Sequence, residues 1–499
     1  MKFLRYLRSM LRPVNKLSPE IISRISQYVP DEDATDARSI IPLTHVCRYW
    51  RWSIISAPRN WTSISSYTTG LATLSLERSK AAPLQLWLDT DSVRQDPEFR
   101  DLIKPYIQNI ETLQFEKLTA IEDLTQTLPN FPQSTPNLRS LRLSHKVTEL
   151  EWDPSIDPFV LFPSTLRSLS MSEIPLYPSF LGLGTLTTLS LHYYEVCPPL
   201  DTVLDVLEGN RLLESVDLQI AFDEPPAWTS HFDESPVWTS QHRTVALNRL
   251  QCLSITFRDQ PIVRALISSI PLRRGAHLVI TFDAEGPDLM LNGILTGMPF
   301  ANLPNLLSPT FVEYRSYPPL MRVIGPNGSF SYHSDWIPFN VIEELLVYNF
   351  AKVKKLHLYP ATTDSYEAIH PTFFPTLETL AIEGDADTDM LHLFSTLFPE
   401  PSFFPSLKTL GFLDCDITEE FMEELTRFAS DRKKTASAWL HRILFVHRDG
   451  EFPSGTSIHK LRRIVTIVDV RMDDKFPKDL VWRGVRRLAV PQVVRNVYT

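Results

Sequence analysis

The chain has 499 residues, of which 43% are hydrophobic and 22% are charged, and its formal net charge is −10. This composition is typical of globular proteins and excludes a largely disordered chain. The acidic balance argues against a nucleic-acid partner, because phosphate binding requires a basic surface. We interpret the short basic run Arg432, Lys433 and Lys434 as solvated surface.

The N-terminus and the cysteines bear on the compartment. Residues Met1 to Arg12 contain no uninterrupted apolar segment of signal-peptide length, and no apolar run in the chain approaches the ~20 residues that span a bilayer. We therefore expect a cytoplasmic or nuclear protein without a membrane partner. The cysteines Cys47, Cys197, Cys252 and Cys415 lack paired spacing, so we expect neither disulfides nor a zinc site and interpret all four as buried.

After a basic tail at residues 1–16, the segment that begins at Leu17 predicts a helix. Ser18 is a candidate N-cap, Pro19 fits the first turn, and Glu20 complements the helix dipole. Apolar residues then recur at helical spacing until Pro30 ends the pattern.

A second helical pattern runs from Ala37 to Trp61. It is carried by Leu43, Val46, Cys47, Trp50, Ile54 and Ile55. Residues 17–66 thus predict a compact helical module whose helices are marginal alone, so that a partner is expected to cover its remaining apolar face. The alternative is that these helices cap the N-terminal end of a repeat array, as such arrays require.

Three segments of this module carry a family resemblance: Leu17–Ile22 (LSPEII), Val46–Arg51 (VCRYWR) and Ala57–Trp61 (APRNW). In this order and spacing they resemble the F-box of the large fungal F-box family, and the match extends to about Ile64. The resemblance implies binding to the small Skp-type adaptor of SCF cullin-RING ubiquitin ligases. By position, the residues that match the contact face of the family are Leu17, Pro19, Ile22, Ile25, Leu43, Val46, Cys47 and Trp50.

Some of these residues must also serve the core of the module. For Trp50 and Trp61 a packing role is as well supported as a binding role, because a tryptophan in a small helical unit often forms its packing centre.

Residues 67–499 repeat a short pattern: an apolar residue, two variable residues, a second apolar residue, one variable residue and a third apolar residue. Clear copies begin at Leu138, Leu166, Leu186, Leu213, Leu250, Leu377 and Leu407, and weaker ones begin at Ile110 and Val353. The alternating end of each copy suits a short strand, and spacings of roughly 20 to 40 residues suit a solenoid of leucine-rich repeats.

We therefore predict a mixed α/β chain, in which the helical module precedes an irregular leucine-rich-repeat-like domain of short parallel strands and helices. The best unit, Leu407–Phe428, joins a strand, a turn with Cys415 and a helix capped near Thr418. It resembles the cysteine-containing leucine-rich repeat that is common in F-box proteins.

Two stretches depart from the repeat. Between about residues 271 and 347 the periodicity is poor, which leaves irregular helices, a long insertion or a break in the array open. A near-tandem duplication at 222–241 is rich in proline, serine and acidic residues and predicts an exposed loop. Its Trp228 and Trp238 are candidate partner-binding residues, with a tolerated surface insertion as the alternative.

Sequence signatures of catalysis are missing: the chain has no Walker loop, GxGxxG turn, GxSxG elbow, HExxH helix or CxxC pair. We expect no catalytic residues, no metal and no cofactor. The predicted function is that of a non-enzymatic substrate-recognition subunit of an SCF-type ubiquitin ligase, which binds a Skp-type adaptor through the module and a protein substrate through the repeats. The alternatives are a ligase-independent leucine-rich-repeat scaffold and an enzyme with a site in the poorly periodic middle.

Overall fold

The structure is a computed structural model of residues 1–499. It describes residues 17–26, 37–118, 127–128, 135–145, 164–174, 176, 183–193, 198–220, 243–257, 266–272, 276–282, 311–316, 319–325, 328–334, 353–359, 374–384, 390–400, 402–413, 415–435, 439–447 and 455–472. The chain forms two compact units. The first comprises residues 1–237 and 245–249, and the second comprises residues 238–244 and 250–499.

The first unit opens with the helical module. Helix α2 (Pro19–Ser26) begins where the sequence predicts it, with proline at the first helical position. The backbone N–H of Ile22 donates to the Ser18 carbonyl at 3.1 Å, which closes the first turn. Glu20 has a lowered pKa because it shares a hydrogen bond with the Ser18 side chain. Pro19 therefore occupies the predicted first helical position, and the side chain of Ser18, the residue before it, contacts Glu20.

The second helical pattern of the sequence is divided into several short helices. They are η2 (Ala37–Ile40), α3 (Ile41–Thr44), α4 (Arg48–Ser56) and η3 (Pro58–Trp61). The division lies at Cys47, whose backbone is extended, with φ −161° and ψ 172°. Its Sγ accepts a hydrogen bond from the Trp50 N–H at 3.5 Å, so Cys47 caps α4 instead of continuing the preceding helix.

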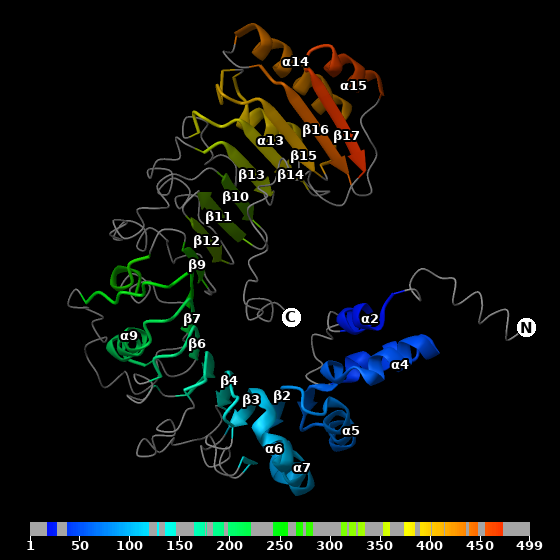
Figure 1. Ribbon diagram of the computed structural model, residues 1–499. Coiled ribbons are helices and arrows are strands. Elements are labelled where there is room, and N and C mark those ends of the chain that lie inside the picture. Colours follow the sequence, from blue (N-terminus) through cyan, green and yellow to red (C-terminus); the bar gives the residue numbers. More distant parts are fainter. Residues whose placement is uncertain are drawn as a thin grey trace, which may run out of the picture. The chain divides into compact units, whose positions relative to one another are not determined.

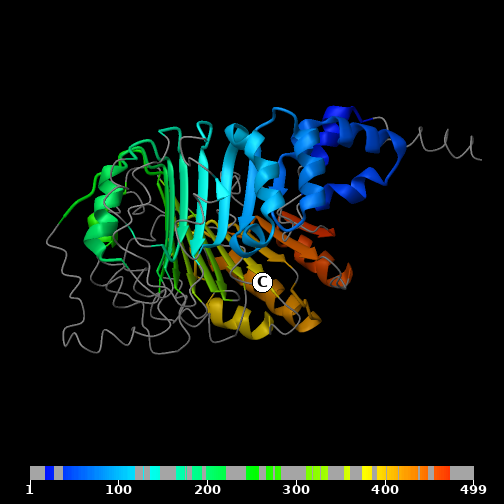
Figure 2. The same cartoon turned by 90° about the horizontal axis from the view of Figure 1, so that it is seen from below.

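A ladder of parallel strands follows the module. The described strands of this unit are β1 (Ser63–Ser65), β2 (Leu84–Asp89), β3 (Ile110–Leu118), β4 (Ser140–His145), β5 (Ser168–Ser172), β6 (Thr188–Tyr193) and β7 (Ser215–Ile220). Each pairs in parallel with the next one along the chain. Figure 2 shows these strands, coloured from blue to green, running side by side.

The register of this ladder explains the repeated apolar pattern. Leu141 on β4 lies opposite Leu169 on β5, which lies opposite Leu189 on β6 and then Val216 on β7. All four side chains are 0–1% exposed. Successive repeats thus stack their apolar residues into one continuous core, as in leucine-rich repeats. The predicted mixed α/β, leucine-rich-repeat-like fold class is confirmed.

Described helices lie between some of these strands, namely β1 and β2, β2 and β3, and β6 and β7. They are α5 (Thr69–Ser79), α6 (Thr90–Gln95), α7 (Pro97–Ile103), η4 (Lys104–Asn109) and α9 (Leu200–Gly209). In Figure 1, α6 and α7 lie beside β2 and β3, and α9 lies beside β6 and β7. Asp89 caps α6 and Asp96 caps α7, because their carboxylates accept from the Ser92 and Phe99 N–H groups. These two helices therefore each start at an aspartate that caps them, Asp89 at the end of β2 and Asp96 just after α6.

The second unit is also built on strands. They are β8 (Cys252–Phe257), β9 (His277–Phe282), β10 (Phe311–Ser316), β11 (Pro319–Gly325), β12 (Gly328–Ser334), β13 (Lys355–Tyr359), β14 (Thr379–Glu383), β15 (Thr409–Leu413), β16 (Arg442–His447) and β17 (Ile467–Met472). From β13 to β17, consecutive strands pair in parallel, as they do from β8 to β9.

The poorly periodic stretch of the sequence contains one reversed strand. Strand β9 pairs in parallel with β12, and β10 pairs in parallel with β13. Between them, β11 runs antiparallel to both β12 and β10. The sheet of this unit therefore continues through the stretch, although the chain does not follow the order of a regular repeat there.

Three described helices accompany the last strands of the second unit, and Figure 1 shows them beside β14 to β17. They are α13 (Met390–Leu397), α14 (Glu419–Thr435) and α15 (Gly455–Arg462). The predicted cap of α14 is present, because the Phe421 N–H donates to the Thr418 hydroxyl at 3.2 Å.

One expectation about α14 was wrong. Arg432 was interpreted as solvated surface, but its exposed fraction is 0%. Its guanidinium donates to the carbonyl oxygens of Phe403, Phe404 and Leu407 at 2.6 to 3.2 Å. These carbonyls lie in the turn before β15, so the arginine fastens the helix of one repeat to the turn that precedes its strand.

Candidate functional site

The helical module has a hydrophobic core of its own. Ile22, Ile40, Trp50, Ile54 and Trp61 form this core, and each is at most 6% exposed. It joins residues from α2, the η2–α3 turn, α4 and η3. A cluster of this size contributes several kcal/mol at about 25 cal/mol per Å² of buried apolar area, enough to hold these short helices together.

The structure divides the predicted adaptor-binding residues into three groups. Ile22 and Trp50 are buried in the core of the module. Leu17, Ile25, Leu43 and Cys47 are partly buried and pack against that core, and Pro19 is half-buried. Val46 alone is well exposed, with 55% of its surface accessible. Most of these residues therefore shape the module from inside.

Three large apolar residues on the surface of the module were missed by sequence reasoning. Ile21 is 45% exposed, Ile41 is 37% exposed, and Trp52 is 60% exposed. Together with Val46 they are the large apolar side chains that the module exposes among its described residues, and we call this set the apolar surface of the module. For Trp52 the sequence held a signal of exposure. It is out of helical phase with Trp50 and Ile54, which define the buried stripe of α4.

Tyr49 of α4 links α4, which carries Trp52, to the residue that leads into α2, which carries Ile21. Its hydroxyl donates to the Leu17 carbonyl at 2.8 Å, just before α2 begins. Its ring stacks near that of Trp52, with centroids 6.4 Å apart. Ile21 follows Leu17 by four residues. The exposed residues of α2 and α4 are thus held by a direct contact between the two helices.

The module is fixed to the first repeat through Trp61. Its Nε1–H donates to the Ile54 carbonyl at 3.1 Å, at the end of α4. The guanidinium of Arg78, on α5, lies over its ring at 4.3 Å. Leu71 and Leu74 of α5 also pack against the core of the module. The helices therefore share a packing surface with the repeat domain.

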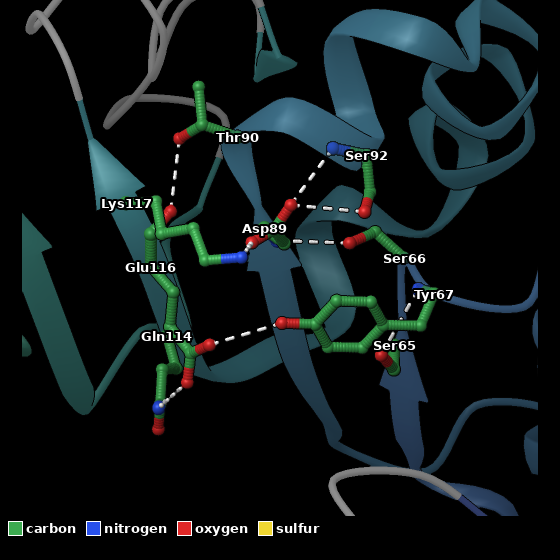
Figure 3. A network of polar contacts seen from close by, with 9 residues as sticks. All are labelled: Ser65, Ser66, Tyr67, Asp89, Thr90, Ser92, Gln114, Glu116 and Lys117. Atoms are coloured by element: carbon green, nitrogen blue, oxygen red, sulfur yellow. Dashed lines mark hydrogen bonds and ion pairs between the residues drawn. The ribbon is translucent and has the colours of Figure 1, made fainter. Parts of the chain in front are cut away.

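A polar network lies where β1, β2 and β3 end (Figure 3). Asp89, only 2% exposed, lies 2.7 Å from the Lys117 ammonium and accepts from the Ser92 N–H and hydroxyl. Nearby, the Tyr67 hydroxyl donates to Glu116 at 3.3 Å. The network ties the ends of three successive strands together.

These contacts shift the pKa values of two acids in the network. Burial would raise the pKa of Asp89, but hydrogen bonds from Lys117 and Ser92, together with the Lys117 charge, hold it below its ordinary value. Burial and the neighbouring carboxylates of Glu116 and Asp89 raise the pKa of Tyr67 to about 12. At neutral pH, Asp89 is therefore an anion and Tyr67 a neutral phenol.

Lys117 reaches Asp89 from an uncommon backbone conformation. Its φ is +56°, in the left-handed region, and the register between β3 and β4 shifts between Phe115 and Leu118. This conformation costs about 1–2 kcal/mol for a residue with a Cβ atom. The ion pair with Asp89 offsets part of that cost.

Ser190, His192 and Asp217 form a buried polar cluster on β6 and β7, and each is 3–7% exposed. The Ser190 Oγ lies 2.7 Å from His192 Nε2, and Asp217 Oδ2 lies 3.6 Å from the same nitrogen. A hydrolytic triad needs serine and aspartate on opposite nitrogens of the ring. The arrangement is therefore unsuited to nucleophilic catalysis.

Other predicted or candidate sites are outside the described residues or have no ligand set. Trp228 and Trp238 lie outside the described residues. Cys415 is buried, whereas Cys47 and Cys252 are partly exposed, which corrects the interpretation of those two. Within the described ranges, no three His, Cys, Asp or Glu side chains gather as a metal site would require. Of the helices the structure describes, none is long and apolar enough to cross a membrane.

Comparisons with known proteins give matches among solved structures. The chain is similar to a leucine-rich-repeat-containing protein of Legionella pneumophila at 11% identity and a TM-score of 0.25, covering 71% of this chain and 87% of the other. It is also similar to a leucine-rich-repeat protein of Leptospira interrogans at 14% identity and a TM-score of 0.30, covering 83% and 97% respectively. No family model and no curated protein sequence matches the chain.

Proposed function

We propose that this chain is a substrate-recognition subunit of an SCF-type cullin-RING ubiquitin ligase. In this proposal the helical module binds a Skp-type adaptor, and the leucine-rich-repeat-like domain binds a protein substrate. The observation that carries the proposal is the apolar surface of the module, Ile21, Ile41, Val46 and Trp52, which lies outside the buried core of the module.

An apolar surface of this kind favours a protein partner. Large apolar side chains that stay exposed outside the core gain little from folding alone, and exposed apolar surface marks interaction sites. Tryptophan is the residue most enriched among interface hot spots. Trp52, the most exposed of the four, is therefore the expected anchor of adaptor binding.

The function requires no bond-making by this chain. A receptor that holds adaptor and substrate at once raises the effective concentration of the substrate near the transferase. The buried residues that match the F-box family, Ile22 and Trp50, act in this proposal by shaping the module, while Val46 contacts the adaptor directly.

One observation favours the alternative, a ligase-independent leucine-rich-repeat scaffold. The core of the module extends onto α5 through Leu71 and Leu74, and Arg78 covers Trp61. This is what a cap of a repeat array does. The cap role and the docking role are compatible, so only adaptor binding separates the two functions.

The test uses exposed residues, because Ile22 is 0% exposed and a charge there would unfold the module. The full chain would be titrated with purified Skp-type adaptor by calorimetry, as wild type and as a Val46→Asp, Trp52→Ala double variant. The matched control is Trp439→Ala, which removes a tryptophan of similar exposure, 53%, from the second unit.

We expect wild type and the control to bind equally, and the double variant to bind at least about a hundredfold more weakly, since a hot spot contributes ≥ 2 kcal/mol and the aspartate adds a desolvation cost. Circular dichroism would verify that the double variant is folded. Wild-type chain that leaves the adaptor unbound would establish the scaffold alternative instead.

A further inference from the structure

Strands β4 and β5 present an unusual set of side chains on the face opposite the apolar core. Leu141 and Leu143 of β4 and Leu169 and Met171 of β5 are buried, so the residues between them face the other way. On β5 and β4 these are Ser168, Ser170, Ser172, Ser140, Arg142 and Ser144. The face is therefore lined by hydroxyl groups around a single charged side chain.

Arg142 stands at the centre of this face. It is exposed, and its cross-strand partners are Gln114 on β3 and Ser170 on β5. It forms neither a hydrogen bond nor an ion pair with any described residue. An arginine fork without a partner, set among hydroxyl donors, is suited to receive carboxylate groups.

Two further arginines lie at the starts of the same two strands. Arg139 precedes β4 and Arg167 precedes β5, and the Arg167 N–H donates to the Arg139 carbonyl at 2.8 Å. Arg139 is 69% exposed and makes a 3.5 Å ion pair with Glu111. Surface pairs of this geometry contribute at most about 1 kcal/mol and exchange readily. Arg167 binds only backbone carbonyls, through its Nη1 atom.

The local charge is more balanced than that of the whole chain. Three arginines, Arg139, Arg142 and Arg167, lie near three carboxylates, Glu111, Glu116 and Glu173, whereas the chain carries a net charge of −10. The next ionic group along this edge, Asp89 with Lys117, is internally paired. Glu116 is engaged by Tyr67 and Gln114. Arg142 and Arg167 are thus the two arginines of these strands that pair with none of the described carboxylates.

We propose that this arginine and serine face of β4 and β5 is the docking surface for an acidic, extended segment of a protein partner. The inference rests on the proposed function, in which the repeat domain holds a protein substrate, and it assigns the substrate class. Arg142 binds a carboxylate through both arms of its guanidinium, Arg139 and Arg167 bind further carboxylates, and the serine hydroxyls donate to the remaining acceptors of the segment.

The spread of the arginines favours several carboxylates over one doubly charged group. Arg139 and Arg167 are one strand apart, or ~4.8 Å, and Arg142 lies three residues farther along its strand, or ~10 Å. Alternate side chains of an extended peptide are ~6.6 Å apart. A segment with more than one acidic side chain can therefore contact Arg142 and an arginine ~10 Å away at the same time, which a single phosphoryl group cannot do.

The probe is a fluorescein-labelled peptide of alternating Glu and Ser, about ten residues long, titrated with the full chain by fluorescence anisotropy at low salt. Three comparison peptides replace Glu by Gln, replace Glu by Lys, or carry one phosphoserine in the Gln peptide. The variants are Arg142→Ala, Arg142→Lys and the matched control Arg211→Ala, which removes an exposed arginine outside these strands of the same unit.

We expect only the Glu peptide to bind, about tenfold more weakly with Arg142→Ala, as loss of a charge-assisted hydrogen-bond pair implies, and unchanged with Arg211→Ala. Arg142→Lys keeps the charge but loses the forked guanidinium, so its affinity for the Glu peptide should lie between those of wild type and Arg142→Ala. Rising salt weakens the interaction.

Three results would each overturn the proposal. The Glu peptide does not bind, the Gln peptide binds as tightly as the Glu peptide, or Arg142→Ala leaves the affinity for the Glu peptide unchanged. Tighter binding of the phosphoserine peptide than of the Glu peptide overturns the assignment of the partner as an acidic segment. Adaptor titration of the same preparations separates the two ideas: a chain that binds adaptor but not the Glu peptide contradicts this inference alone.

Discussion

Arg432 is a residue that the sequence pattern predicts to be exposed and that the structure shows to be buried. In the sequence it begins a basic run, Arg432 to Lys434, at the end of a helix. In the structure Lys433 and Lys434 are exposed, whereas Arg432 is fully buried, and burial lowers its pKa to about 10. It remains charged at neutral pH, and the hydrogen bonds to three carbonyl oxygens stabilise this buried charge.

Replacing Arg432 by Met leaves the carbonyls of Phe403, Phe404 and Leu407 without their donor. Part of that loss is offset, because a buried charge is removed at the same time. We expect the free energy of unfolding to fall by about 2–4 kcal/mol, measured by urea denaturation followed by circular dichroism. Lys433→Met, at an exposed position, should change it by less than about 0.5 kcal/mol. Equal midpoints for the two variants would refute the clamp role.

Asp89 gives a prediction about pH. Its pKa in the folded chain is lowered, whereas an unfolded aspartate titrates near 3.9. The unfolded state therefore binds more protons near pH 4, so the contribution of Asp89 to stability is complete above about pH 5 and is lost as the pH falls through its folded pKa.

The corresponding variant is Asp89→Asn, which cannot make the ion pair with Lys117. We expect it to be less stable than wild type at pH 6 and to approach wild type as the pH falls toward 3, in urea midpoints measured across this range. A stability difference that stays constant with pH would show that the Lys117 pair is not responsible.

At the scale of elements, the sequence predicted the strands whose repeats keep their spacing. Copies that begin at Leu138, Leu166 and Leu186 became β4, β5 and β6, because three apolar residues at this spacing must share one face of a strand. Strands β10 to β12 were not predicted, since β11 runs antiparallel and the pairing is set by distant partners. Local patterns carry no information on such pairing.

The sequence also predicted the candidate site only in part, because local patterns do not show which face of a helix is buried. The resemblance located the module and its helices, but it could not separate residues that face a partner from residues that face the core. Ile22 and Trp50 are buried, and Ile21 and Trp52 next to them are exposed. The difference arises from the phase of each helix, and in α4 that phase is set by the cap at Cys47, a break that helical periodicity alone did not reveal.

Gly384 tests the packing between consecutive repeats. It follows β14, and a Cβ atom there would lie 2.9 Å from the Cys415 Cα and 3.0 Å from its Sγ. We expect Gly384→Ala to lower the free energy of unfolding by about 1–3 kcal/mol, because neighbouring turns must separate. Gly70→Ala in α5, where a Cβ atom meets nothing within 4 Å, should instead be neutral or stabilising by up to about 1 kcal/mol. Thermal unfolding of both variants distinguishes the two effects.

At the scale of the molecule, the two kinds of surface suit different partners. The module presents apolar residues, led by Trp52, and the face of β4 and β5 presents arginine and serine. Apolar burial supports stable association, whereas exposed charge mainly sets specificity and association rate. Under the two proposals, the module would hold a stable partner and the strands an exchangeable one, as a substrate receptor requires.

The most direct test of the proposed receptor function is amide hydrogen exchange of the full chain with and without purified Skp-type adaptor. We expect slower exchange on adaptor binding in α2 and α4, Pro19–Ser26 and Arg48–Ser56, with little change in β4 and β5. Protection confined to the strands, or the absence of any protection at saturating adaptor, would contradict it.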